Sequence, residues 1–338
     1  MSLKIGNTSL NKLYKGAVEI TKLYLGNVLI YSSSLYNAIT TAYNTRALAD
    51  SYTVESLPCV NTITNSFTST PVAAMIPSGF KTSKFASILP NDGTGDFTVV
   101  RNGSKTRVNS NGLIETLPPN VIAPDYTDTG CPVLLIEPQS TNLITYSEDL
   151  SQWSLSNATV SNGYLAPDGT NNAHKVTDLG SGYVYRGYNA SNNLTHTRTI
   201  WARTVSGTGT VALCAHNSNS NTLFTITSNW QRFQVIGYNG TGAASFYGVD
   251  FRAGNLTEVI LWGAQAEDLI GLPATSYVPT AISTASRLSD AVTLDTASVT
   301  GTITSITETI DGIAQTPITT IPSTYTIPVG KINKIIID

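Results

Sequence analysis

Aromatic and neutral polar side chains are the residues of this chain best suited to chemistry. The sequence holds four Trp and sixteen Tyr residues. Flat aromatic rings stack on the C–H groups of sugars, and neutral polar side chains bind sugar hydroxyl groups. In a strand, Tyr183 and Tyr185 would share one face, which is either a stacking platform or an ordinary packing surface. The candidate ligand-binding residues are Trp153, Tyr183, Tyr185 and Tyr188.

The other three tryptophans are expected in the core. Trp201, Trp230 and Trp262 lie in strongly strand-like runs, and residues of such runs pack against the neighbouring strands of a sheet. Trp153 follows a polar segment instead, so both a core and a surface position stay open for it.

The spacing of the titratable residues gives little support to catalysis or to zinc binding. The three histidines are far apart and match no zinc-site spacing, so a turn or surface position is expected for each. Glycoside hydrolysis needs two carboxylates that face each other across the scissile bond. In the pairs Glu148/Asp149 and Glu267/Asp268, neighbouring side chains of a strand would point to opposite faces. We therefore expect no enzyme activity, with carboxylate pairs from distant parts of the chain as the open alternative.

Composition excludes several classes of protein. Only 12% of the residues are charged, 41% are hydrophobic, and 19 Lys and Arg residues face 22 Asp and Glu residues. A disordered chain would have fewer apolar residues and a higher net charge, and a nucleic-acid-binding protein would have basic clusters. No apolar run is long enough to span a membrane, and the first residues carry no apolar signal segment. We expect neither nucleic acid nor a membrane as a partner.

From Pro71 onward the sequence predicts a mainly β fold. Short strand-like runs recur and are separated by turn signals such as Asn102-Gly103 and Asp168-Gly169. Evenly spaced short strands of this kind are typical of a β-sandwich or jelly roll. The predicted strands are 97–101, 132–136, 183–188, 197–204, 210–215, 230–238 and 259–263.

The first thirty residues contain a ten-residue repeat. Glycines stand at positions 6, 16 and 26, and the fifth position of each copy is apolar. This period suits one strand and one tight glycine turn per copy, which together make a small sheet that buries little by itself. Such a sheet either packs on the rest of its own chain or serves for attachment and oligomerisation.

Two segments differ from the strand-rich middle of the chain. Over 35–50 and 53–67, apolar residues recur at helical spacing. From 296 onward, prolines interrupt short apolar segments. Prolines near strands indicate edge strands, and an exposed edge usually needs to be covered by another chain or domain. The predicted domains are a ten-residue β repeat at 1–33, a helical linker at 34–70, a jelly roll with an extended lead-in at 71–292, and a small C-terminal β unit at 293–338.

Several motifs resemble those of virion appendage proteins of tailed bacteriophages, which include tail fibres and head fibres. The opening repeat has the Gly-x-x-x-apolar-x-Lys-apolar-Tyr pattern of their N-terminal segments. A run of motifs in the middle of the chain is similar to a pattern common in phage fibre proteins, and the part that follows resembles a carbohydrate-binding jelly roll. These motifs are TRVN (106–109), GLIE (112–115), LLIEPQ (134–139), TNLI (141–144), YSED (146–149), PDGT (167–170), WQRF (230–233), WGAQ (262–265) and ATSYVPT (274–280).

The resemblance implies a structural protein of the virion that presents a β-sandwich to host surface polysaccharide. It implies a homo-oligomer, with a trimer favoured over a dimer, because symmetric assembly buries exposed strand edges. The N-terminal repeat would contact other virion proteins. Jelly rolls of this type often hold a structural calcium ion, for which Glu148 and Asp168 are the candidate ligands; no other cofactor is expected. The alternatives are a polysaccharide depolymerase, or an architectural head decoration or adaptor protein without a ligand.

Overall fold

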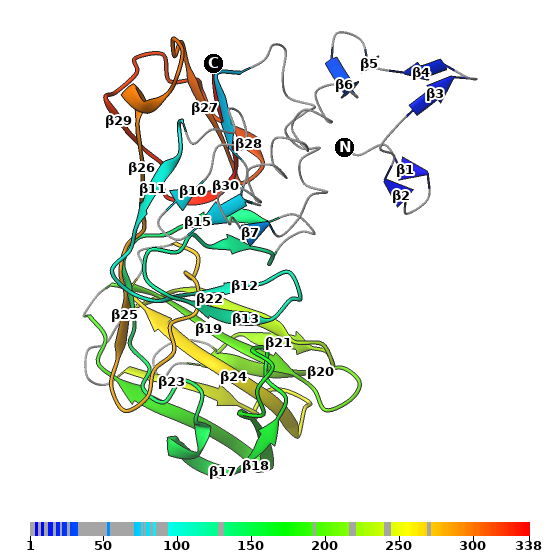
Figure 1. Ribbon diagram of the computed structural model, residues 1–338. Helices are drawn as coiled ribbons and strands as arrows, with labels where there is room; N and C mark the ends of the chain where they lie inside the picture. Colours follow the sequence, from blue (N-terminus) through cyan, green and yellow to red (C-terminus); the bar gives the residue numbers. More distant parts are fainter. Residues whose placement is uncertain are drawn as a thin grey trace.

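The computed structural model of this chain consists mainly of β-strands (Figure 1). Helix within the described residues is limited to two short 3₁₀ turns, Leu150–Gln152 and Thr296–Ser298. No described helix is long and apolar enough to cross a membrane. The mainly β class predicted from the sequence is confirmed. The structure describes short strands within 1–70, and then residues 71–75, 77, 79–81, 84–85, 94–127, 132–191, 194–215, 221–239, 245–268 and 272–338.

One eight-stranded antiparallel sheet forms the jelly-roll sandwich. The order of neighbouring strands is β21-β20-β23-β18-β24-β19-β22, and β17 pairs with β18. The strands predicted between 183 and 263 coincide with members of this sheet. The strands are β17 (Ser154–Tyr164), β18 (Ala173–Tyr188), β19 (Thr195–Arg203), β20 (Gly209–Ala215), β21 (Leu223–Ile226), β22 (Gln231–Asn239), β23 (Ser245–Asp250) and β24 (Glu258–Glu267).

The long strand β18 turns this sheet into two layers. Its first part pairs with β24 and its last part pairs with β23. Between these parts, Gly180 and Ser181 have φ angles of 122° and 56°. Gly182 follows, and a Cβ atom there would lie 2.1 Å from the carbonyl oxygen of Asn157, so the bend requires glycine. Apolar side chains of the two layers share one core, which includes Val184, Ile200, Leu213, Val249 and Leu261.

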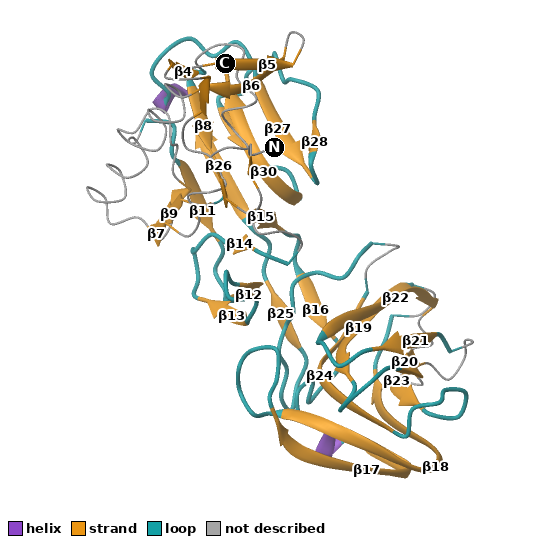
Figure 2. Ribbon diagram, turned by 90° about the vertical axis from the view of Figure 1, so that its right-hand side faces the viewer, coloured by secondary structure: helices purple, strands orange, loops and turns teal. Residues whose placement is uncertain are grey.

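A second sandwich, here called the flanking sandwich, is built from chain segments on both sides of the jelly roll. One sheet has the order β29-β26-β11-β10-β9-β7, and the other has β14-β15-β30-β27-β28 with β8 beside β30. Figure 2 shows the two sandwiches as separate lobes. The strands are β7 (Thr53–Val54), β8 (Ala73–Met75), β9 (Gly79–Lys81), β10 (Lys84–Phe85), β11 (Phe97–Val100), β14 (Pro124–Asp125), β15 (Val133–Ile136), β26 (Ala291–Asp295), β27 (Ile306–Ile310), β28 (Ile313–Ala314), β29 (Thr324–Thr326) and β30 (Gly330–Ile337).

The C-terminal strands belong to the flanking sandwich, so 293–338 does not form the separate small unit predicted from the sequence. β30 pairs with β15 and β8, and β26 pairs with β11. Ile335 and Leu294 share a buried core with Met75 and Phe97. Separated from the strands before the jelly roll, the C-terminal strands would expose this apolar surface to water, which is unfavourable. The lead-in predicted within 71–292 therefore packs with the C-terminal segment.

The first seventy residues contribute short strands to the described structure. The six strands within 4–32 form three separate two-stranded sheets, so the predicted single sheet with one strand per repeat is corrected. A tight turn joins two antiparallel strands, so each repeat glycine lies between two paired strands. The helical linker predicted at 34–70 lies outside the described residues, except that Thr53–Val54 is a strand. The pairs are β1 (Lys4–Ile5) with β2 (Thr8–Ser9), β3 (Leu13–Lys15) with β4 (Val18–Ile20), and β5 (Lys22–Leu25) with β6 (Val28–Ser32).

Two connecting strands form a neck between the sandwiches. β16 (Ser140–Asn142) leads into the jelly roll, β25 (Ala285–Arg287) leads out of it, and the two pair antiparallel. Figure 2 shows them side by side between the lobes. Near the neck, the hairpin of β12 (Lys105–Val108) and β13 (Ile114–Leu117) packs on the jelly roll, where Ile114 joins an apolar cluster with Trp262.

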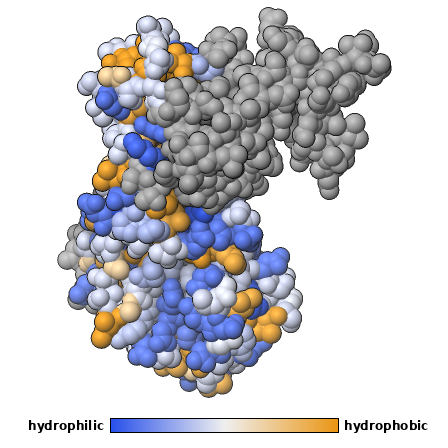
Figure 3. Space-filling model, viewed as in Figure 1, coloured by the Kyte–Doolittle hydropathy of each residue, from blue (hydrophilic) through white to orange (hydrophobic). Residues whose placement is uncertain are grey.

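The surface of the jelly-roll sandwich is largely polar. Its face in Figure 3 is mainly hydrophilic, and hydrophobic side chains lie on it in small separate groups. Leu155, Leu179 and Leu223 are among the exposed large apolar side chains of this sandwich. Scattered residues of this kind are normal on protein surfaces. A binding site on this sandwich is therefore expected in a hollow.

A buried network of charged side chains lies at the neck. The Nζ atom of Lys105 lies 2.6 Å from a carboxylate oxygen of Asp290 and 2.9 Å from one of Glu137. Arg101 binds Asp290 at 2.9 Å. Glu137 accepts hydrogen bonds from the backbone N–H and the hydroxyl group of Ser276, at 2.6 and 2.7 Å. Buried charges need such pairing and hydrogen bonding, so these contacts fix how the two sandwiches meet.

The pKa of Glu137 reflects this network. Burial by itself would raise it, but the positive charges of Lys105 and Arg287 hold the pKa of Glu137 at about 2, well below its ordinary value of 4.5. Because the pKa is lower in the folded state, ionised Glu137 stabilises the folded protein above about pH 4.5. That contribution is lost as the pH falls toward 2.

We predict that Glu137→Gln lowers the free energy of unfolding by about 3 kcal/mol at pH 7, because an uncharged amide no longer compensates Lys105. The difference from the wild type should shrink between about pH 4.5 and pH 2, as measured by urea unfolding at each pH. Glu258→Gln is the control. It removes the partly exposed partner of Lys175 and should change the free energy by less than about 1 kcal/mol. A difference that does not vary with pH would contradict the prediction.

Candidate functional site

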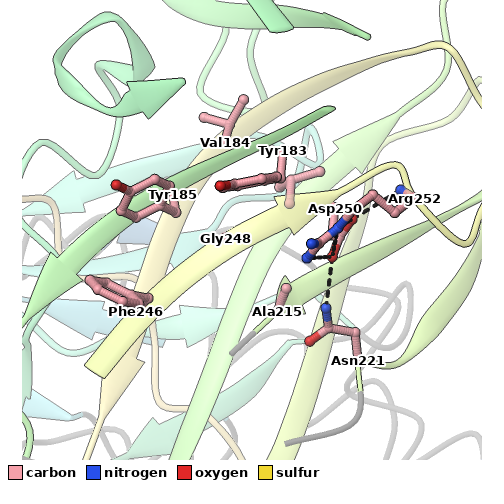
Figure 4. Close-up of a pocket in the computed structure, with 10 residues that line it drawn as sticks. Tyr183, Val184, Tyr185, Ala215, Asn221, Phe246, Gly248, Asp250 and Arg252 are labelled. Atoms are coloured by element: carbon pink, nitrogen blue, oxygen red, sulfur yellow. Dashed lines mark hydrogen bonds and ion pairs between the residues drawn. The ribbon is translucent and has the colours of Figure 1, made fainter. Parts of the chain in front are cut away.

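A groove opens on the outer face of the layer that contains β18, β23 and β20 (Figure 4). Val184, Tyr247 and Val249 point into the core, so the residues that alternate with them point outward. The hollow has a volume of about 360 Å³, which is within the range of small-molecule sites. Its lining residues include Tyr183, Tyr185, Phe246, Gly248, Asp250 and Arg252.

Three aromatic rings form one wall of the groove. The ring centroids of Tyr183 and Tyr185 are 5.8 Å apart, and the rings are tilted by 36°. Phe246 meets Tyr185 edge to face at 5.1 Å and keeps 37% of its surface exposed. Both tyrosines are half-buried. Aromatic rings at these separations support one another, so the wall is a preformed apolar surface.

Small residues make the floor of the groove hollow. Gly248 lies opposite Tyr185 in the β-ladder, and Ala215 lies opposite Gly248 on the next strand. A Cβ atom at Gly248 would lie 2.7 Å from the carbonyl oxygen of Val184 and 3.3 Å from the Cβ atom of Tyr185. Glycine at this position therefore lets the two strands approach and leaves space beside the tyrosine.

A salt-bridged carboxylate forms the polar end of the groove. Asp250 binds the Nη2 atom of Arg252 at 2.6 Å and its Nε atom at 2.9 Å, and it accepts a hydrogen bond from Asn221 at 2.9 Å. Burial acts to raise the pKa of Asp250, but hydrogen bonds and charge from Arg252 lower it below its usual range. The guanidinium group also lies 4.8 Å from the ring centroid of Tyr183, a cation–π contact that joins the polar end to the aromatic wall.

The groove thus combines an apolar wall with a polar end that carries no net charge. Asp250 is the single carboxylate among the described lining residues. Since its pKa is lowered, it stays ionised and accepts hydrogen bonds rather than donating a proton. Arg252, whose side chain is 56% exposed, presents N–H donors at the surface. This arrangement suits a ligand that has an apolar face and several hydroxyl groups.

Strand alternation and register explain which groove residues the sequence could reveal. The sequence left an outward and an inward position open for Tyr183 and Tyr185, and the structure places both on the outward face. Phe246, Asp250 and Arg252 were not predicted. The alternation along β23 is a signal for the first two, but it becomes a site only through the pairing of β23 with β18.

Trp153 and Tyr188 were predicted as ligand-binding residues, but both are core residues, with 4% and 6% of their surface exposed. Trp153 donates a hydrogen bond from Nε1 to the carbonyl oxygen of Tyr146 at 3.0 Å. The hydroxyl group of Tyr188 contacts Nδ1 of His196 at 3.1 Å and accepts a hydrogen bond from Arg198. Interior partners satisfy the polar atoms of both rings, which allows their burial.

The predicted calcium ligands are engaged with other groups of the protein. Glu148 accepts hydrogen bonds from Asn172 at 3.0 Å and from Tyr277 at 3.2 Å. Burial raises the pKa of Glu148, and the charge of Asp168 adds to the effect. Asp168 accepts hydrogen bonds from the backbone N–H and the hydroxyl group of Thr170. Among the described residues, no group of three or more His, Cys, Asp and Glu side chains is placed to hold a metal ion, so the calcium site stays a prediction.

The histidines and the other three tryptophans were also assigned positions from the sequence, and the structure agrees with some of these assignments only. His174 and His196 were expected at turns or on the surface, but they are 5% and 0% exposed. Trp262 lies in the core with 1% exposed, as expected. Trp201 and Trp230 are only partly buried and border a second hollow. Buried imidazoles need hydrogen-bond partners, which a sequence pattern does not reveal.

The comparisons with known proteins concern the fold. No protein-family profile and no curated protein sequence matches the chain. A family 29 carbohydrate-binding module is similar with a TM-score of 0.30 and 7% identity, over 40% of this chain and 92% of the module. A family 4 module gives 0.27 and 15%, over 38% and 94%. The active domain of bacteriophage CBA120 tailspike protein 4 gives 0.27 and 9%, over 37% and 21%. At these TM-scores the likeness carries no argument about function, which has to come from the residues of the groove.

We predict that Gly248→Ala destabilises the protein by about 1–3 kcal/mol, because the new methyl group would press on Val184 and Tyr185. Gly187→Ala is the matched control on β18. Its Cβ atom would meet Phe246 at 3.6 Å, an ordinary contact, so its effect should stay below about 0.5 kcal/mol. Urea unfolding measures both variants. Equal stability of the two would show that the close approach at Gly248 is not a constraint.

Proposed function

We propose that this protein binds glycans through the groove of Tyr183, Tyr185 and Phe246, as part of a phage virion appendage. The observation that carries the proposal is the outward-facing tyrosine pair beside the ion pair of Asp250 and Arg252. The rings offer a flat surface to the C–H groups of a sugar, and the ion pair offers an acceptor and donors to its hydroxyl groups.

The chemistry of the groove favours uncharged sugars. The charges of Asp250 and Arg252 compensate each other at 2.6 Å, so the groove has no excess charge to attract an ionic ligand. The aromatic wall and the floor stand on paired strands, which limits the entropy lost on binding. We infer binding rather than hydrolysis in this groove, because hydrolysis requires a second carboxylate opposite the first.

The virion role rests on the sequence resemblance. The glycine repeat at 1–33 and the motifs between 106 and 149 resemble segments of phage fibre proteins. We infer that the repeat attaches the chain to other virion proteins and that the jelly roll faces the host. A symmetric trimer would present three grooves, and a particle would present many more. Weak individual sites would then hold the host surface through avidity.

We predict that Tyr185→Ala weakens neutral-glycan binding by roughly tenfold or more, because it removes the ring between Tyr183 and Phe246. An array of neutral and acidic bacterial oligosaccharides identifies the tightest neutral binder, and calorimetry with that oligosaccharide then compares wild type and variant. Since Tyr185 is half-buried, the melting temperature should fall only slightly.

Trp230→Ala is the matched control, because it removes a partly buried aromatic ring that lies outside the groove. It should leave neutral-glycan binding unchanged. Equal affinity of wild type and Tyr185→Ala, or equal losses in the two variants, would place the site elsewhere. A large drop in the melting temperature of Tyr185→Ala would instead assign that ring a packing role.

The proposed assembly predicts a native mass three times that of one chain, measured by light scattering after size exclusion. Twice the chain mass would favour the dimer. A mass equal to one chain would contradict a trimer that forms without other virion proteins.

A further inference from the structure

A second hollow of about 390 Å³, here called the junction cleft, lies where the β12–β13 hairpin meets the jelly roll. Trp201, Trp230 and Arg232 line it from the jelly roll, and Arg107 lines it from the hairpin. Trp201 and Arg232 lie opposite each other on β19 and β22. These strands belong to a different layer from β23 of the groove, so a ligand in the cleft would not occupy the groove.

Two tryptophan rings border the junction cleft in fixed positions. Trp201 meets Trp262 edge to face, with 5.4 Å between the centroids. Trp230 donates a hydrogen bond from Nε1 to the carbonyl oxygen of Leu165 at 3.2 Å, and the guanidinium group of Arg203 lies 5.2 Å from its ring. Because both rings are only partly buried, apolar surface stays available to a ligand.

Arg232 places a positive charge in the cleft, and the carboxylates of Glu267 and Glu137 act on it through their charge without forming an ion pair. It donates to the carbonyl oxygen of Thr275 at 2.8 Å and to the hydroxyl group of Thr199 at 3.0 Å, and it lies 4.4 Å from the ring centroid of Trp201. No carboxylate oxygen of the described residues is within 4.0 Å of its nitrogens, and Nε has no hydrogen-bond partner. These two bonds use one N–H each of Nη1 and Nη2, and each of these nitrogens carries a second N–H.

The other charges of the cleft are already engaged. Arg107 is paired with Glu115 at 2.6 Å. Asp125 accepts two backbone N–H groups at 2.9 Å each, and Glu137 belongs to the network at the neck. Lys331 also lines the cleft. Since a charge in such a confined site is stabilised by pairing, Arg232 favours an anionic ligand.

We propose that the junction cleft binds a carboxylate-bearing sugar, with the carboxylate on Arg232 and the sugar ring against the tryptophans. A guanidinium group and a carboxylate form paired, charge-assisted hydrogen bonds, and a tryptophan ring stacks on sugar C–H groups. The volume of about 390 Å³ admits a small saccharide and not a folded chain. The cleft therefore selects an acidic sugar, whereas the groove selects a neutral one.

The test uses the full-length protein with glucuronate, galacturonate and N-acetylneuraminate as acidic sugars. Glucose and galactose provide rings without a carboxylate, and inorganic phosphate provides an anion without a ring. Tryptophan fluorescence is the readout, because two of the four tryptophans line the cleft and no described lining residue of the groove is a tryptophan. We expect a saturable change at millimolar concentration with at least one acidic sugar, and none with the neutral sugars or phosphate.

Variants separate the cleft from the groove. Arg232→Gln should weaken acidic-sugar binding by roughly tenfold or more, with circular dichroism as the check that the variant folds. Trp230→Ala, at a partly exposed ring, should weaken it as well, as measured by calorimetry because this variant lacks one of the reporting tryptophans. Tyr185→Ala is the matched control in the groove and should bind the acidic sugar like the wild type.

Three results would overturn the proposal. The first is a wild type that responds to none of the acidic sugars. The second is a response to phosphate as strong as the response to the sugars, which would make the cleft a general anion site. The third is acidic-sugar binding that Tyr185→Ala abolishes, which would place that ligand in the groove. If the neutral-glycan experiment on the groove fails, the test of acidic-sugar binding in the junction cleft still stands, because the two sites share no described lining residue.

Discussion

The buried charges at the neck are the constraint on which the arrangement of the molecule depends. Lys105, Glu137 and Asp290 come from distant parts of the chain, and each requires the others because an unpaired charge in the interior is highly unfavourable. Their pairing fixes the path of the strands that enter and leave the jelly roll. It also holds the β12–β13 hairpin in place, so the junction cleft has two walls. Within the jelly roll, the bend of β18 at Gly180 plays the corresponding role for the groove.

Local patterns predicted strands well but could not predict their distant partners. Alternation and turn residues act over a few positions, and they located β11, β15, β18, β20 and β24. The place of β30 depends on its pairing with β15 and β8, at the other end of the chain. Its isoleucines share a core with Met75 and Phe97, and no short segment contains that information. The C-terminal segment consequently looked like a unit of its own.

The candidate site also combines residues that the local sequence indicates with residues that only strand pairing brings together. Tyr183 and Tyr185 are close in sequence, so their shared face was visible from the chain alone. Asp250 and Arg252 join them only through the register between β18 and β23. Trp153 is a residue for which the local sequence was misleading, because it follows a polar segment and its ring is nevertheless buried. The carbonyl oxygen of Tyr146 accepts a hydrogen bond from its indole N–H. A backbone partner of this kind cannot be recognised from the amino-acid composition.

The paired strands β16 and β25 give the jelly roll a single point of entry and exit. Everything between them can be exchanged by two recombination events while both sheets of the flanking sandwich keep their strands. A lineage of such proteins can thus replace the whole jelly roll without rebuilding the flanking sandwich. Residues at the neck, including Glu137 and Asp290, are then the part that every incoming module must match. Selection on that small interface would act separately from selection on the outer surface of the jelly roll.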